Sequence, residues 1–377
     1  MEYYQRVLLA ALTPAVAVCV QAQVTTSSLG GQILNESNQP VAGVVVKATH
    51  VPSGTTYSAV TNANGRYTIQ GMRPGGPYTV AIHYLGYNAE KFENINLELG
   101  NMFPLDASLS PKSTDLGEAT VVANRKTRTG AGENFTLQKM QNIPTIDRSV
   151  ASIVKNTPMA VSSKSGGISF VGSNNRYNSF QIDGVVANDV FGLSADGTNG
   201  GQTGANPISM DAVQELQVVI APYDVRQGGF TGGGINVVTK SGTNDFHGSA
   251  YSYFNNQSMY GKYSAVRDYA KVPLTDQFER TFGGTLGGPI IKNKLFFFAS
   301  VENKRKSYPN NIYPGYSEKY ISTDVAQQVV DRYYALTGIR DSFGPRNVES
   351  HSLGITSRID WNINETNHLT LRYQHNN

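Results

Sequence analysis

The residues whose spacing could support catalysis are few, and each set lacks the partners that the chemistry needs. Ser152 and Lys155 have the S-x-x-K spacing of serine β-lactamases, and Lys240 begins a K-S-G similar to their K-T-G. The S-D-N element that would complete this set is missing from the sequence. The glycine pattern at 283–288 is followed by Pro289 and no helical pattern, so it is not a nucleotide-binding loop. We therefore expect no catalytic residues and a protein that is not an enzyme.

Patterns for metals and cofactors are missing as well. His50 and His83 stand without the nearby His, Cys or Glu ligands that a zinc site needs. Asp196 and Asn199 lie in a glycine-rich stretch that lacks the alternating acids and terminal Glu of an EF-hand loop. Cys19 is the only cysteine, so a disulfide framework is excluded. We expect neither a metal nor a cofactor.

The overall charge argues against a nucleic-acid partner. The 31 basic and 28 acidic side chains give a formal net charge of +3 over 377 residues, evenly spread along the chain. The basic run 125–128 is expected to be a solvated part of a linker. The composition is rich in Gly, Asn, Ser, Thr and Tyr, which favours β-structure with many turns.

Residues 1–22 are predicted to be a secretory signal peptide. Arg6 gives the positive start, Val7–Val20 form an apolar stretch, and small or aliphatic residues follow at 20–22. The stretch is too short for a membrane helix. We expect export, with a mature chain that starts near Gln23. Acylation of Cys19, as in a lipoprotein, is the less favoured alternative.

The elements that follow are predicted to be almost entirely β-strands. Residues 23–110 contain short β-prone runs separated by turn signals, with a tight-turn signal at Asn64-Gly65, and this predicts a small β-sandwich. The runs lie at 30–34, 41–48, 56–60, 66–69 and 78–82.

A linker is expected at 111–130, and within it lies a β-prone strip, residues 118–122, between polar residues. Two interpretations of this strip stay open. It is one more strand of the sandwich, or it is a coupling peptide that adds itself to a partner sheet through backbone hydrogen bonds.

Residues 131–244 carry three ordered motifs. A strand ends in an Asp183-Gly184 turn, the run V-Q-E-L-Q-V follows at 213–218, and a glycine cluster then leads into I-N-V-V-T-K-S-G. Glycines occupy 228–229 and 232–234. They are expected to allow backbone conformations closed to other residues, and to let the backbone press closely against a surrounding barrel wall.

Alternation dominates the chain from residue 245 onward. In 352–364 an apolar row and a polar row occupy opposite faces, and the alternation resumes at 369–374 after a turn. A water-soluble sandwich also alternates. The length of these strands, near the ~9–11 residues that cross a bilayer, and the positions of Trp361 and Tyr373 favour a lipid-facing β-barrel.

These motifs, in this order, resemble the TonB-dependent outer-membrane receptors. The sandwich segment resembles the carboxypeptidase regulatory-like domain, the strip resembles a TonB box, and residues 131–244 closely resemble the receptor plug. The runs F-E-R-T-F-G-G-T-L-G-G-P and K-L-F-F-F-A-S-V-E resemble early barrel strands of the Oar-like subgroup. The fold class implied is mainly β, with a small sandwich, an α/β plug and the first strands of an incomplete transmembrane antiparallel barrel.

The resemblance also implies roles for particular residues, which are structural handles and not catalysts. The candidate TonB box comprises Glu118, Ala119, Thr120, Val121 and Val122. Plug-core or wall-facing roles fall to Arg176, Asp183, Gly184, Glu215, Arg226, Gly232, Gly233 and Gly234.

By the same resemblance, the expected function is energy-driven import across the outer membrane. The implied partners are a TonB-type energy-transducing protein, an extracellular ligand of open class and outer-membrane lipid, while a surface lipoprotein stays an open question. A plugged barrel of about 22 strands needs at least ~400 residues, and 245–377 hold about a quarter of that, so we expect a fragment or a truncated gene product. The alternatives are a surface adhesion or export platform, a non-functional truncated receptor, and a soluble periplasmic binding protein.

Overall fold

The structure is a computed structural model. It describes residues 24–112, 119–122, 131–145, 148–162, 167–194, 197–201, 205–221, 227–260, 262–264, 271–273, 276–310, 312–315, 321–365 and 367–377. The predicted signal peptide with Cys19, the basic run 125–128, and the residues Glu118, Asp196 and Arg226 lie outside these ranges.

The first unit is a two-sheet sandwich. One sheet has the order β4-β1-β7, with β8 also paired to β1, and the other has the order β3-β2-β5-β6-β9. The turn at Asn64-Gly65 forms as predicted, with Gly65 at φ +67. Alternating side chains such as Leu29, Val46 and Tyr78 fill the space between the sheets. The strands are β1 (Ser27–Asn35), β2 (Val45–His50), β3 (Thr55–Val60), β4 (Arg66–Met72), β5 (Gly75–His83), β6 (Glu90–Leu97), β7 (Met102–Pro104), β8 (Ala107–Leu109) and β9 (Ala119–Val122).

The second unit, which we call the plug, is a five-stranded sheet with small helices. Its strand order is β10-β15-β16-β13-β14, and β13 runs parallel to β16. Both central strands are buried along their whole length because the sheet is covered on both faces. The elements are β10 (Ala131–Thr136), α2 (Leu137–Asn142), α3 (Val150–Val154), β11 (Ala160–Ser162), β12 (Ile168–Phe170), η1 (Asn175–Tyr177), β13 (Ser179–Ile182), β14 (Val185–Val186), η3 (Met210–Ala212), β15 (Val213–Ala221) and β16 (Gly234–Thr239).

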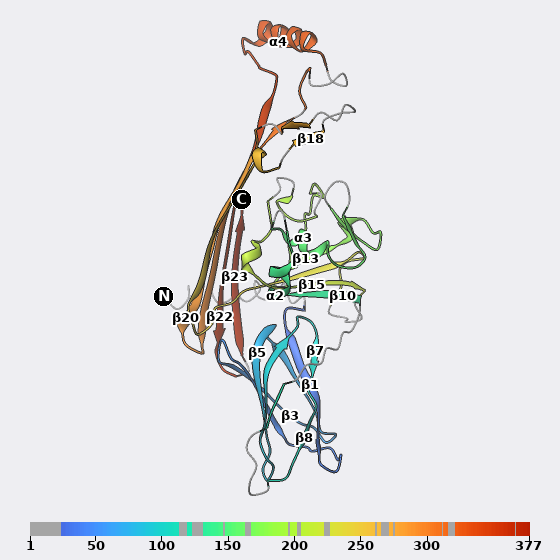
Figure 1. Cartoon of the computed structure of the whole chain (residues 1–377), viewed down its shortest axis with the longest axis vertical. Helices are drawn as coiled ribbons and strands as arrows, with labels where there is room; N and C mark the ends of the chain where they lie inside the picture. The colour runs from blue at the N-terminus through green and yellow to red at the C-terminus, as the bar shows by residue number, and fades with distance from the viewer. Residues whose placement is uncertain are drawn as a thin grey trace, which may run out of the picture.

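The third unit, which we call the wall, is an antiparallel meander of long strands in the order β17-β20-β21-β22-β23. Figure 1 shows it as a curved sheet beside the plug, with the sandwich at one end and α4 at the other. No helix among the described residues is long and apolar enough to cross a membrane. The elements are β17 (His247–Asn256), η4 (Gln257–Met259), β18 (Lys262–Ser264), β19 (Lys271–Pro273), β20 (Phe278–Ile291), β21 (Leu295–Asn310), α4 (Thr323–Thr337), β22 (Arg346–Asn362) and β23 (His368–Asn376).

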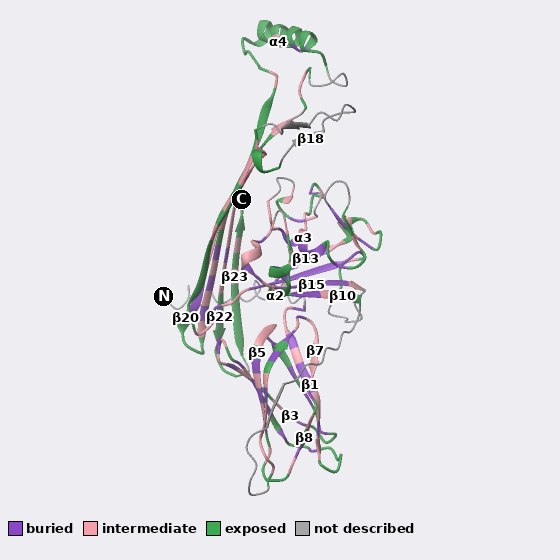
Figure 2. Cartoon of the chain, viewed as in Figure 1, coloured by how far each residue is buried: buried purple, intermediate pink, exposed green. Residues whose placement is uncertain are grey.

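The wall is apolar outside and mainly polar inside, the reverse of a soluble sandwich, although the buried Phe296 and Phe298 also face inward. Trp361 and Leu371 are 46% and 65% exposed on the outer face, whereas Asp360 and Asn362 on β22 are buried on the face toward the plug (Figure 2). Such a surface is stable when lipid covers the apolar face. The sheet does not close within the described residues, in agreement with the predicted incomplete barrel.

Candidate functional site at the junction of plug, wall and sandwich

The Asp183-Gly184 turn carries the central acidic group of the plug. Asp183 has φ +46 and Gly184 has φ +81, the two positive angles that a tight hairpin between β13 and β14 requires. The Asp183 carboxylate accepts hydrogen bonds from the Thr239 backbone N–H at 2.8 Å and from Thr239 Oγ1 at 2.7 Å. These two bonds fix the turn to the end of β16, so the carboxylate is held in one place.

Two arginines of the wall meet this carboxylate. Arg358 and Arg372 are cross-strand partners on β22 and β23, and both point inward. Arg358 Nη1 lies 3.5 Å from Asp183 Oδ1, and Arg372 Nε lies 3.7 Å from Asp183 Oδ2. Arg358 Nη1 also donates to the Thr239 carbonyl oxygen at 3.1 Å. The plug is therefore joined to the wall by a charged contact from which water is largely excluded.

A second carboxylate extends this network to the sandwich. Asp360 is 1% exposed and forms a bidentate pair with Arg358, whose Nε lies 2.9 Å from Asp360 Oδ2. Thr370 Oγ1 donates to Asp360 at 2.8 Å. From the sandwich, Arg73 Nη2 lies 3.6 Å from Asp360 Oδ1, and Arg73 Nη1 donates to Ser241 Oγ of the plug at 3.2 Å. A buried carboxylate needs such partners, because desolvation of an unpaired charge costs several kcal/mol.

Glu215 makes an independent contact between plug and sandwich. It is 1% exposed, and its Oε1 accepts from the Leu99 N–H at 3.0 Å. The Leu99 carbonyl accepts from Gln217 Nε2 at 2.7 Å and from Asn134 Nδ2 at 3.0 Å. Burial raises the pKa of Glu215 to about 8, so it is mainly protonated at neutral pH. Gly100 follows at φ +72, where a Cβ would lie 2.7 Å from Gln217 Nε2, so this loop requires glycine.

The turn between β2 and β3 of the sandwich rests on the adjoining end of the wall. The Asn244 N–H donates to the Pro52 carbonyl at 2.8 Å, and Asn362 Nδ2 donates to Thr55 Oγ1 at 2.8 Å. Asn244 also bonds Asn293 at the turn between β20 and β21. The sandwich is thus fixed to both the plug and the wall.

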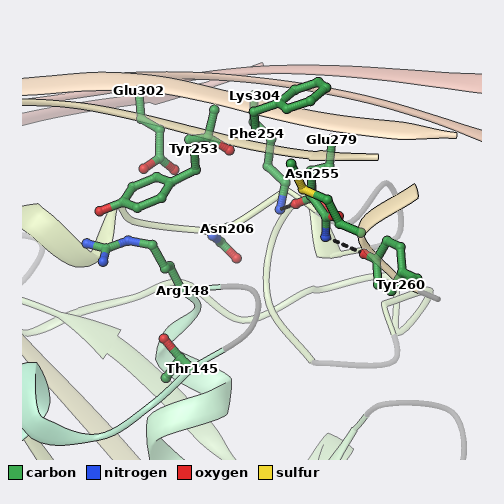
Figure 3. A pocket seen from close by; sticks show the side chains of 12 residues that line it. Thr145, Arg148, Asn206, Tyr253, Phe254, Asn255, Tyr260, Glu279, Glu302 and Lys304 are labelled. Carbon is green, nitrogen blue, oxygen red and sulfur yellow. Dashed lines mark hydrogen bonds and ion pairs between the residues drawn. The ribbon is translucent and has the colours of Figure 1, made fainter. Parts of the chain in front are cut away.

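A cavity of about 480 Å³ lies between plug and wall (Figure 3). It borders the end of β17 opposite to the end that adjoins the sandwich. The Arg148 guanidinium of the plug lies 4.5 Å from the ring centroid of Tyr253 and 2.8 Å from Asp211. On the wall, Lys304 Nζ lies 2.6 Å from Glu279 Oε1. The lining therefore combines aromatic rings with balanced charges, as is typical of sites for polar organic ligands.

The sequence-predicted residues do not all gather at the junction. Asp183, Gly184 and Glu215 lie there, but Arg176 is exposed and donates to the Gly192 carbonyl at 2.9 Å, so it is not part of the plug core. Because Arg226 and Glu118 lie outside the described residues, the structure gives no position for them.

The expected backbone freedom is found in only part of the glycine cluster, at Gly229 with φ +81, and the three glycines that follow have a different basis. Gly232, Gly233 and Gly234 do not have positive φ angles, and they face other parts of the plug and not the wall. A Cβ on Gly233 would lie 2.3 Å from the Phe170 ring, and one on Gly232 would lie 2.3 Å from Asn178 Oδ1. Close packing within the plug, not an unusual backbone conformation, therefore requires glycine there.

The described part of the predicted coupling strip, β9 (Ala119–Val122), is a strand of the sandwich. It pairs in parallel with β6, with Lys91 opposite Thr120 and Glu93 opposite Val122. Of the two interpretations of the strip, the structure therefore adopts the first. The second interpretation, a coupling peptide that pairs with a partner sheet, requires β9 to leave β6.

Sequence reasoning assigned no role to Arg73, Arg358, Asp360 or Arg372. The last three stand on the polar row of strands whose opposite row is apolar, and charges on the inward face of a membrane strand are a usable signal. Arg73 offers no such signal, because its partner Asp360 is far away in the sequence.

Comparisons with known proteins agree with this architecture. Residues 28–110 match the carboxypeptidase regulatory-like domain family, and residues 238–314 match the outer membrane beta barrel domain family. The chain is 30% identical over 293 residues to the TonB-dependent transporter Oar of Myxococcus xanthus, which covers 73% of this chain and 26% of that protein. The chain thus spans about a quarter of the length of that relative.

Solved outer-membrane proteins are similar at lower identity. The transporter YddB from Escherichia coli has 13% identity and a TM-score of 0.43, covering 65% of this chain and 33% of its own. The siderophore receptor PirA from Pseudomonas aeruginosa has 14% identity and a TM-score of 0.40, covering 66% and 36%. The strands of the structure confirm the predicted mainly β fold class, and the matches to the outer membrane beta barrel domain and to the transporter Oar confirm the predicted outer-membrane localisation.

Proposed function

We propose that this chain, a homologue of the TonB-dependent transporters, provides the sandwich, plug and first wall strands of an outer-membrane transporter that imports an extracellular ligand. The observation that carries the proposal is the junction itself. A folded plug lies against the polar face of a membrane wall and is held there by ion pairs from Asp183 to Arg358 and Arg372. Beside these ion pairs, Phe298 of the wall packs into the apolar core of the plug. The described contacts between plug and wall are otherwise mainly polar, and water can replace such contacts when the plug moves.

The ligand is proposed to bind in the cavity of about 480 Å³ between plug and wall. That cavity is bordered by plug and wall together, so a bound ligand contacts the part that has to move. Arg148 of the plug lies over the ring of Tyr253 of the wall, which supports a link between occupancy of the cavity and the position of the plug. The class of ligand stays open.

Energy is proposed to enter through the coupling strip. A TonB-type protein of the inner membrane would pair with the strip by strand addition, in which backbone hydrogen bonds supply the affinity. Because Ala119–Val122 already pair with β6, the strip has to leave the sandwich first. β6 leads directly to the Leu99 loop that binds Glu215 and Gln217, so removal of β9 acts on the strand that also contacts the plug.

The division of the chain supports the same picture. We propose a signal peptide at 1–22, a regulatory-like sandwich at 23–110, a linker with the strip at 111–130, a plug at 131–244 and barrel strands from 245. A soluble periplasmic protein is disfavoured, because residues such as Trp361 and Leu371 would then expose their apolar side chains to water.

Deletion of residues 119–122 in the full-length protein tests the proposal. Cells that make the wild type should deplete at least one component of the medium that the deletion strain leaves behind, and a protonophore should give the same defect. Purified deletion protein should also lose binding to the periplasmic domain of the energy-transducing protein. Depletion by neither strain, together with normal surface attachment, would instead support an adhesion platform, and equal depletion by both strains would show that uptake does not need the strip.

A further inference from the structure

A second cavity, of about 780 Å³, lies where sandwich, plug and wall meet, and its lining carries more positive than negative charge. Four basic side chains border it, one from the sandwich, one from the plug and two from the wall: Arg73, Lys240, Arg358 and Arg372. The carboxylates that face the arginines are Asp183 in the lining and Asp360 just behind it. Asp211 also acts on Lys240, but it is paired with Arg148, which lies outside the lining. The excess is therefore two positive charges.

The two carboxylates do not satisfy all of these donors. Arg358 is fully engaged with Asp360, Asp183 and Thr239. Arg372 uses Nε toward Asp183 and Nη1 toward Gln374, which leaves Nη2 without a partner among the described residues. The Lys240 ammonium has neither a hydrogen bond nor an ion pair within the described ranges.

The environment of Lys240 supports the conclusion that its positive charge is only partly balanced. Burial lowers its pKa, and the charge of Asp211 only partly opposes that effect. His50 in the same lining adds no positive charge, because burial and Arg73 lower its pKa to about 4 and leave it neutral. A cation that is partly buried without a counter-ion is an energetic cost that a bound anion removes.

We propose that this cavity is an oxyanion site, which takes a phosphate or carboxylate group between Lys240 and Arg372. The planar guanidinium of Arg372 matches the paired oxygens of such groups, and Lys240 supplies a point charge. Ser241 lines the same cavity, and its hydroxyl, which accepts from Arg73, keeps its own proton to donate to an anion. The anion bridges plug and wall, and it lies beside Arg73 of the sandwich.

The site has a physical consequence that does not depend on transport. An anion bound only by the assembled junction stabilises the docking of plug and wall by mass action. Its absence leaves the surplus cations to repel one another. Oxyanion concentration near the inner surface of the outer membrane would then set how firmly the plug is held.

Binding of inorganic phosphate by the purified full-length protein in a non-ionic detergent tests the proposal. Titration calorimetry and thermal unfolding would be followed at constant ionic strength, with chloride as the exchanged ion. We expect saturable binding and a rise in Tm with phosphate. K240Q and R372Q should each raise the half-saturating concentration by about tenfold, the loss of one charge-assisted hydrogen bond.

K47Q is the matched control, since Lys47 is exposed on β2 and its loss changes the net charge equally. K47Q should bind phosphate as the wild type does. K240Q keeps the pairs of Asp183 and Asp360 with Arg358, so it remains informative if R372Q weakens the wall. Acetate in a parallel titration separates a preference for carboxylates from one for phosphate.

The proposal is overturned if the wild type shows no saturable binding of either anion. Unchanged binding by both K240Q and R372Q would overturn it as well.

Discussion

Arg358 Nη1 on the wall and Asp183 Oδ1 at the tip of the plug hairpin lie 3.5 Å apart, in a contact where each side chain is less than 15% exposed. The same guanidinium forms an ion pair with Asp360 on its own strand, so Arg358 pairs with a plug carboxylate and a wall carboxylate at the same time. A substitution of Asp183 or of Asp360 therefore alters Arg358, which is the partner of the other carboxylate. This coupling makes Asp183 the most informative single position for plug docking.

The substitution D183N should loosen the plug from the wall. It leaves Arg372 without an anionic partner and weakens the contact of Arg358, at a cost of about 3 kcal/mol for a broken buried pair. Urea titration with a fluorescent label on the plug would measure the loss as a lower midpoint of plug release. D331N is the control, because the Asp331–Arg340 pair is exposed and should contribute less than about 1 kcal/mol. An equal effect of both substitutions would contradict the assigned role of Asp183.

Docking of plug and sandwich should weaken as pH rises through the neutral range. Burial raises the pKa of Glu215 from 4.5 to about 8, so the docked state holds a proton that the separated state releases. Below about pH 4.5 both states are protonated, and the contact has its full strength. Between about 4.5 and 8 the docked state loses stability by about 1.4 kcal/mol per pH unit, and above 8 the loss levels off.

E215Q should remove this pH dependence. The glutamine oxygen can still accept from the Leu99 N–H, and its amide replaces Oε2, which has no hydrogen-bond partner in the wild type. Thermal unfolding measured from pH 5 to 9 should show a flatter profile for E215Q, with a growing advantage over the wild type toward pH 8. E36Q changes an exposed carboxyl and should leave the profile as it is. A wild-type profile that is flat over this range would contradict the raised pKa.

Local patterns in the sequence predicted the fold because each pattern reflects one local surface. The alternation on β22 and β23 could be recognised in the sequence because one face of the strands is turned to lipid and the other to the plug. The Asp183-Gly184 hairpin could be predicted because few residue pairs adopt two consecutive positive φ angles. The order of these motifs then predicted sandwich, plug and barrel.

The contacts that join the units were not predictable from local patterns. Leu99 binds Glu215 across 116 positions, and it does so through a backbone N–H that every residue type except proline possesses. Arg73 reaches Ser241 and Asp360 from a sandwich loop whose sequence resembles any exposed turn. Gly232 and Gly233 were predicted for their backbone freedom, yet their close approach to Asn178 and Phe170 shows that side-chain volume decides the residue type there. Long-range packing of this kind leaves no periodic signal.

A disulfide that locks the coupling strip should block its use by the energy-transducing partner. Lys91 on β6 and Thr120 on β9 are Cα partners, so K91C/T120C can cross-link the strip to the sandwich. The oxidised protein should lose binding to the partner's periplasmic domain, and reduction should restore it. K47C/S58C cross-links the neighbouring strands β2 and β3 of the same sheet without touching the strip. If oxidised K91C/T120C still binds the partner, release of the strip from β6 is not required.

The outer face of the wall should tolerate charge poorly, and the loop helix should tolerate it well. Leu371 lies on the apolar row of β23, where an arginine at the bilayer midplane costs about 2–4 kcal/mol. L371R should therefore lower the fraction of full-length protein that folds in the outer membrane, measured by heat-modifiable migration in gels. Leu336 on α4 is 74% exposed, well beyond the strands, and L336R should change folding little, by less than about 0.5 kcal/mol. Both substitutions add the same charge to an exposed leucine, so only a lipid environment at position 371 distinguishes them. Equal folding of the two variants would mean that β23 does not face lipid.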